Sequence, residues 1–178
     1  MPELASDYLT QKEAARQRTQ PFRVWLAAAF LVAVWVALII MPALFLGNGV
    51  QGISGSLYSF FGYVCHQIPE RSLHLFGHKM AVCSRCFGVY FGLLFGLLIY
   101  PLWRKLDDIE PLPRFWLFLS LVPIGVDWSL GVFGIWENTH ASRFFTGAIL
   151  GVACAVFIIP ALVEIVRNLT RKRHPNIR

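Results

Sequence analysis

Four long stretches of this sequence are almost free of charge, and they constrain the fold more than any other feature. They cover about residues 24–46, 82–103, 115–136 and 144–163. A helix rises about 1.5 Å per residue, so roughly 20 apolar residues cross a hydrocarbon core of about 30 Å. Charged residues, only 15% of the chain, gather between these stretches. The sequence therefore predicts an all-α, polytopic membrane bundle of four transmembrane helices within one membrane domain, 24–166.

The segment between the first two spans contains a shorter apolar run. Residues 57–64 are mostly aromatic or aliphatic, but they are too few to cross a bilayer. We therefore expect a re-entrant or interfacial segment over residues 50–64. Farther along, Pro69 opens a sequence, 69–76, that favours a short helix.

The distribution of basic residues predicts the orientation of the bundle. Twelve of the 16 Lys and Arg residues lie in the 1–23 tail, in the middle loop and in the 167–178 tail. Four spans place these three segments on the same side, and an excess of positive charge marks that side as cytoplasmic. Both termini are thus expected to be cytoplasmic. The N-terminal tail is polar, and its first ~20 residues are expected to fray. The C-terminal tail is basic.

The net charge of +6 also bears on binding partners. A basic soluble domain would suggest nucleic acid, but these basic residues flank apolar runs, where they set topology and meet anionic lipid. The expected partner is the lipid bilayer, no nucleic-acid partner is expected, and self-association into a homo-oligomer is left open.

Small residues recur at helical spacing in two of the spans. Gly88, Gly92 and Gly96 share one face of the second span, and Gly147 and Gly151 share one face of the fourth. Such faces let two helix backbones approach closely in a membrane. The pattern predicts that the second and fourth spans pack against each other.

Three cysteines form the most distinctive chemical feature. Cys65 lies in the outer segment, and Cys83 and Cys86 form a Cys-x-x-Cys pair at the start of the second span. The free N–H groups and the dipole at a helix start favour a thiolate. All three cysteines are expected at the outer membrane face.

A metal site is the leading interpretation of these cysteines. A Cys-x-x-Cys pair can hold one tetrahedral ion, with Cys65 as a third ligand and His66 as the preferred fourth. The alternatives for the fourth position are His74 and His78. Zinc is the ion that best suits such a mixture of sulfur and nitrogen.

Two other interpretations stay open. The pair could exchange disulfides and pass oxidising equivalents to a lipid-soluble quinone, with Arg85 lowering the thiol pKa. One disulfide could instead only brace the outer loop of a small transporter or scaffold protein, although four spans without inverted repeats disfavour transport by a monomer. Cys154, in the middle of the fourth span, is expected to be a small packing residue.

Polar residues in the last two spans give a second candidate cluster. Asp127 is the one acid within an apolar run, and a carboxylate there should be paired or face a cavity. We expect it to pair with Arg143. Asp127, Glu137 and Arg143, with Asn138 and His140, could form a catalytic wall opposite the cysteines, or only an ion pair and a solvated turn.

Two motifs resemble the signature of a domain-of-unknown-function family of small predicted membrane proteins from bacteria and archaea. They are Cys-His-Gln-Ile-Pro-Glu-Arg-Ser at 65–72 and Cys-Ser-Arg-Cys-Phe-Gly-Val-Tyr-Phe-Gly at 83–92. The similarity covers about residues 50–165 and includes Asp127 and an Arg-x-x-x-Gly at 143–147. The resemblance implies a prokaryotic inner membrane with a periplasmic or extracellular outer face, and it implies no reaction.

Overall fold

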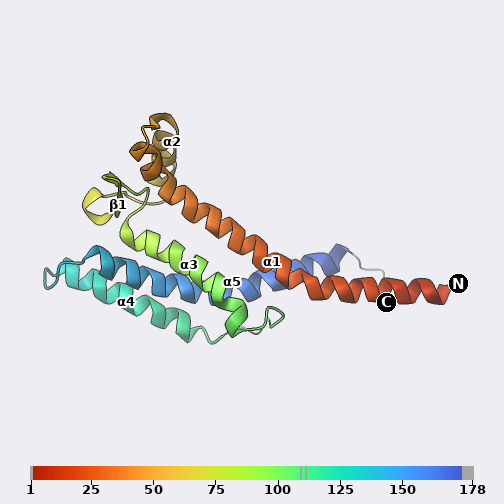
Figure 1. Cartoon of the computed structure of the whole chain (residues 1–178). Helices are drawn as coiled ribbons and strands as arrows, with labels where there is room; N and C mark the ends of the chain where they lie inside the picture. The colour runs from red at the N-terminus through yellow and green to blue at the C-terminus, as the bar shows by residue number, and fades with distance from the viewer. Residues whose placement is uncertain (1, 109, 111, 174–178) are drawn as a thin grey trace.

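The computed structural model of the chain describes residues 2–108, 110 and 112–173, with side chains from Thr19 to Thr170. The described chain is all-α apart from one small hairpin (Figure 1). The helices, in chain order, are α1 (Pro2–Gly47), α2 (Gln51–Gly62), α3 (Ser84–Trp103), α4 (Phe115–Val132) and α5 (His140–Arg173).

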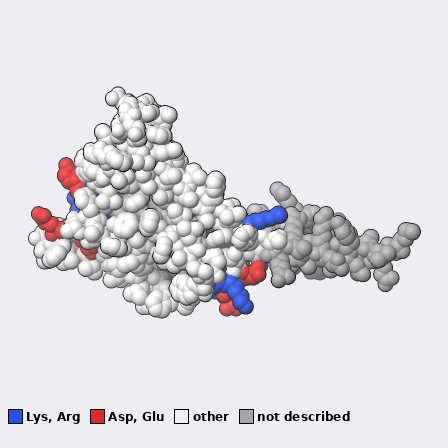
Figure 2. Space-filling model, in the orientation of Figure 1, with Lys and Arg blue, Asp and Glu red and all other residues white. Residues whose placement is uncertain are grey.

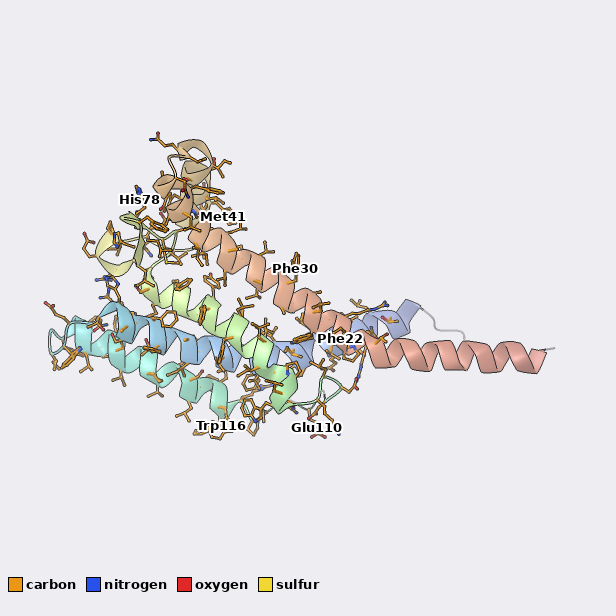
Figure 3. All side chains as sticks on the ribbon, in the orientation of Figure 1. Phe22, Phe30, Met41, His78, Glu110 and Trp116 are labelled. Atoms are coloured by element: carbon orange, nitrogen blue, oxygen red, sulfur yellow. The ribbon has the colours of Figure 1, made fainter. Side chains whose placement is uncertain are left out.

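Four of these helices are long and apolar enough to span a membrane, which confirms the predicted number. The candidate spans are Thr19–Gly47, Ser84–Trp103, Phe115–Val132 and His140–Thr170, with mean hydropathies between 1.6 and 2.7. The outsides of the helices are apolar, as lipid requires: Figure 3 shows Phe30 and Trp116 on the surface of the bundle, and both side chains are more than half exposed. On the face in Figure 2, charged side chains lie at two ends with an uncharged band between them.

The ends of two helices differ from the prediction. α4 ends at Val132 rather than near residue 136, because Gly134 adopts a positive φ of 66° in the turn that follows. α5 begins at His140 rather than 144, and the hydroxyl of Thr139 caps it by accepting the N–H of Ser142 at 3.1 Å.

The terminal tails also differ from the prediction. α5 continues past 163 to Arg173, so the basic tail begins as helix, and its residues 174–178 lie outside the described part. α1 already begins at Pro2, so the tail that was expected to fray is helical from its second residue.

The region between α1 and α3 holds α2, one turn of 3-10 helix, η1 (Pro69–Arg71), and a hairpin of β1 (His74–Leu75) and β2 (His78–Lys79). The predicted helix over 69–76 is therefore wrong beyond its first turn. The two residues at the hairpin tip, Phe76 and Gly77, have positive φ angles of 52° and 79°. Positive φ at both loop residues is the backbone conformation that a tight two-residue hairpin requires. α2 is too short to span, as expected. Its entry into the bilayer stays a prediction.

The glycine faces pack as predicted, and α3 makes its most extensive contacts with α5. A Cβ added at Gly88 would overlap the backbone oxygen of Phe144, and one at Gly92 would overlap that of Ala148. One added at Gly151 would overlap the backbone oxygen of Val89. Contact between bare backbones is the geometry that small residues permit in membranes.

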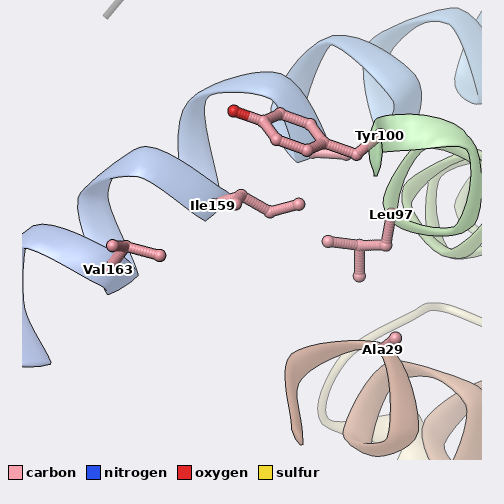
Figure 4. Close-up of a cluster of buried hydrophobic side chains, with 6 residues drawn as sticks. Ala29, Leu97, Tyr100, Ile159 and Val163 are labelled. Atoms are coloured by element: carbon pink, nitrogen blue, oxygen red, sulfur yellow. The ribbon is translucent and has the colours of Figure 1, made fainter. Parts of the chain in front are cut away.

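Residue numbers rise together along this contact, so α3 and α5 run parallel. Both helices begin at one end of the bundle, named here the cysteine end, and both finish at the other, the tail end. α1 also packs on this pair, and the indole N–H of Trp25 donates to the backbone oxygen of Leu97 at 2.7 Å. A buried cluster joins the three helices toward the tail end (Figure 4), and its members are Ala29, Leu97, Tyr100, Ala155, Ile159 and Val163.

Candidate metal centre

Three cysteine sulfurs converge at the cysteine end. The sulfurs of Cys65, Cys83 and Cys86 all lie within 4.8 Å of one another, and none of the chain's four cysteines forms a disulfide. Three ligands at the usual zinc–sulfur distance of about 2.3 Å around a tetrahedron would be roughly 3.8 Å apart. The arrangement is therefore compact enough for a single ion, and Cys154 is not part of it.

Backbone hydrogen bonds hold the two sulfur-bearing segments together. Cys83 is the N-cap residue of α3, and its backbone N–H donates to the sulfur of Cys65 at 3.2 Å. The link between the hairpin and α3 is tied down as well, because the N–H of Ala81 donates to the carbonyl of Ile39 on α1 at 3.3 Å. Cys65 thus reaches the start of α3 although 18 positions separate it from Cys83.

The surroundings of Cys65 are apolar and closed, whereas Cys83 and Cys86 are half-buried. Cys65 is 7% exposed and belongs to a buried cluster built from α1, α2 and the segment before α3. Its other buried members are Ile39, Phe61, Met80, Ala81 and Val82. Electrostatic interactions are strong where water is excluded, so a bound cation would interact strongly with thiolates here.

The local hydrogen bonds favour the thiolate form of Cys65. Donation from the side chains of Cys83 and Cys86 holds the pKa of the Cys65 thiol well below its usual value, although burial acts in the opposite direction. The start of α3 adds free N–H groups and the positive end of its dipole. Thiolate is the form that binds metal.

No histidine of the described residues belongs to the sulfur group. His66 directly follows Cys65, but its side chain is exposed and its ring nitrogens are not part of the group. His74 and His78 lie on the two strands of the hairpin, where His74 pairs with Lys79 rather than sharing a helix face with His78. The structure thus brings together three of the four predicted ligands, and His66 as the fourth stays a prediction.

The carboxylate of Asp127 has a different partner from the one expected. Asp127, 9% exposed on α4, pairs with the guanidinium of Arg85 from the first turn of α3. Asn138 donates its side-chain amide to the Asp127 carboxylate at 3.1 Å and to its backbone oxygen at 2.7 Å. The expected ion pair with Arg143 is therefore wrong, because the long Arg85 side chain reaches from the start of α3 to Asp127 near the end of α4.

A buried serine that sequence reasoning did not single out connects three segments. Ser84, fully buried at the start of α3, donates its hydroxyl to the backbone oxygen of Arg71 at 3.0 Å. The hydroxyl oxygen of Ser84 also lies 2.8 Å from Nδ1 of His140, the first residue of α5. A hydroxyl has one hydrogen, so Nδ1 of His140 is the donor of this second bond. The one available signal was the position of Ser84 inside the Cys-x-x-Cys pair.

The two remaining candidate catalytic residues, Arg143 and Glu137, differ in their surroundings. Arg143 is half-buried and lies close enough to Cys83, Arg85 and Asp127 for their charges to act on it. Glu137 is exposed and makes no ion pair with the described side chains. The polar wall expected opposite the cysteines stays a prediction.

Comparisons with known proteins give the chain relatives but no activity. Residues 65–157 match a family described as predicted membrane protein (DUF2085). An uncharacterized protein of Methanocaldococcus jannaschii is 43% identical over 114 residues, which cover 64% of this chain and 73% of the relative. An uncharacterized protein of Methanothermobacter thermautotrophicus is 33% identical over 100 residues, or 54% of this chain and 85% of that protein. No solved structure matches.

Proposed function

The chain belongs to the DUF2085 family of predicted membrane proteins, and we propose that it holds a zinc ion on Cys65, Cys83 and Cys86 at the outer face of a prokaryotic cell membrane. The observation that carries the proposal is the convergence of three sulfurs within 4.8 Å. Soft thiolate ligands select zinc among the common divalent ions when geometry is tetrahedral. The distribution of basic residues supports the outer location and cytoplasmic termini.

Three protein thiolates leave one position of the zinc tetrahedron to be filled. A fourth protein ligand would close the site and make it structural, whereas water or a substrate there would make it a catalytic type of site. His66 is the protein candidate because it directly follows Cys65. The side chain of His66 is exposed and lies outside the sulfur group, so His66 is less well supported as a ligand than the three cysteines. The proposal therefore depends on the three thiolates.

Replacing Cys83 by serine should remove stoichiometric zinc from the purified protein. The hydroxyl is a poor ligand for this ion, and the loss of one of three thiolates leaves too few donors. Metal content is measured by mass spectrometry on protein expressed in medium with trace zinc. Cys154→Ser is the matched control, because Cys154 lies in α5 outside the sulfur group, and it should keep the zinc.

Wild-type protein that lacks stoichiometric zinc would overturn the proposal. The same preparations can be treated with a thiol-trapping reagent in intact cells. The thiol–disulfide alternative would be supported instead if the cysteines are trapped as a disulfide and the ratio of disulfide to free thiol follows the redox state of the quinone pool.

A further inference from the structure

The cysteine end carries more positive charge than its described side chains neutralise. The charges of Arg71 and Arg85 both repel that of Arg143, and Asp127 attracts it. Asp127 is already paired with Arg85, and neither Arg71 nor Arg143 makes an ion pair with a described side chain. Asp127 is therefore the carboxylate of Arg85. The half-buried Arg143 is left beside two other guanidinium groups, with only the more distant charges of Asp127 and Cys83 among the described groups to offset them.

The nearby acids do not remove this excess. Glu70 and Glu137 lie in the neighbouring turns, but both side chains are exposed and neither forms an ion pair within the described part of the chain. A zinc ion with three thiolates would carry one net negative charge, which is still too little to balance the remaining two guanidinium groups. A half-buried cation that no described side chain pairs with, as Arg143 is, is costly at the edge of a membrane, whereas Arg71 is exposed.

Two hydrogen bonds tie together the backbone segments that carry these groups. The bonds of Ser84 to the Arg71 backbone and to His140 connect the loop, α3 and α5 at one point. Because α3 and α5 run parallel, the positive ends of both helix dipoles add to the field at the same place. Nδ1–H of His140 donates to Ser84, so in the neutral ring Nε2 is an acceptor and could receive a hydrogen bond from the P–OH group of a phosphate.

We propose that Arg71, Arg85 and Arg143, with His140 beside them, bind the phosphoryl group of an anionic ligand at the cysteine end. Guanidinium groups match phosphate oxygens in paired hydrogen bonds, and phosphate carries a charge of about −1.5 to −2 near neutral pH. The ligand is a free phosphate compound or a phospholipid headgroup, because the site lies at the edge of the spanning helices. None of these side chains is a proposed zinc ligand, so the site does not depend on the metal.

The test compares Arg143→Gln with Arg23→Gln in the full chain. Arg23→Gln removes the same charge from an exposed position of α1 at the tail end. In neutral detergent, inorganic phosphate is titrated by calorimetry. In a second arm, the protein is placed in nanodiscs of phosphatidylcholine with a small fraction of phosphatidylglycerol, and the retained anionic lipid is counted by native mass spectrometry.

We expect Arg143→Gln to weaken binding at least tenfold relative to both wild type and Arg23→Gln. Binding of inorganic phosphate identifies a free anion as the ligand, and selective retention of phosphatidylglycerol identifies a headgroup. Arg71→Gln, at an exposed position, provides a second variant if Arg143→Gln does not fold. Failure of wild type to bind either probe, or equal binding by Arg143→Gln and Arg23→Gln, overturns the proposal. Zinc content measured on the same samples separates this result from the fate of the metal site.

Discussion

Replacing Gly92 by leucine should strongly destabilise the bundle. A Cβ at this position would lie 2.6 Å from the Cα of Ala148 and would overlap its backbone oxygen, so the helices would have to separate. Overpacking in a protein core costs about 1–3 kcal/mol and occasionally more. Here the obstacle is backbone that cannot rotate away, so we expect a loss of at least about 3 kcal/mol. Gly92→Ala should already lower the thermal unfolding midpoint in detergent.

Gly125→Leu is the matched control for this prediction. Gly125 also lies inside a candidate span, on α4, but no atom lies within 4 Å of the position of its Cβ. The added side chain would enter lipid, so unfolding should be nearly unchanged. Equal unfolding midpoints for Gly92→Leu and Gly125→Leu would contradict the parallel packing of α3 on α5.

Asp127→Leu should destabilise the protein more than any other single charge removal. It leaves the Arg85 guanidinium, whose side chain is 23% exposed, without its carboxylate, and it takes an acceptor from Asn138. Breaking a buried ion pair from one side costs about 3–5 kcal/mol. The partial exposure of Arg85 places the expected loss near the lower value. Thermal unfolding in detergent measures it.

A double variant separates this ion pair from a general packing defect. Arg85→Met combined with Asp127→Leu removes both charges, so it should recover part of the stability that Asp127→Leu loses. Asp107→Leu is the control, because Asp107 is 62% exposed in its pair with Arg167. Exposed pairs contribute about 0–1 kcal/mol. Equal losses for Asp127→Leu and Asp107→Leu would contradict the role given to Asp127.

The membrane architecture could be predicted because it depends on local properties of the chain. The length of an apolar run determines whether it spans, and the spacing of Gly88, Gly92 and Gly96 determines which face approaches another helix. The same reasoning placed Cys65 beside the Cys-x-x-Cys pair, because both lie next to the same membrane edge. None of these inferences needs the lateral order of the helices.

The partner of Asp127 could not be predicted because it depends on that lateral order. Depth in the membrane is given by position in the span, and both Arg85 and Arg143 have a suitable depth. Only the packing of the starts of α3 and α5 against the end of α4 decides which guanidinium reaches the carboxylate. The hairpin was missed for a related reason, since the positive φ at Phe76 overrides the helical preference of its neighbours.

X-ray absorption at the zinc edge tests the central claim most directly, because it reports the atoms that surround the metal. Protein loaded with stoichiometric zinc should show three sulfur neighbours at about 2.3 Å and one nitrogen or oxygen neighbour at about 2.0–2.1 Å. The His66→Ala variant should keep the sulfur shell, whichever atom fills the fourth position. A zinc ion surrounded only by nitrogen and oxygen would contradict a centre built on Cys65, Cys83 and Cys86.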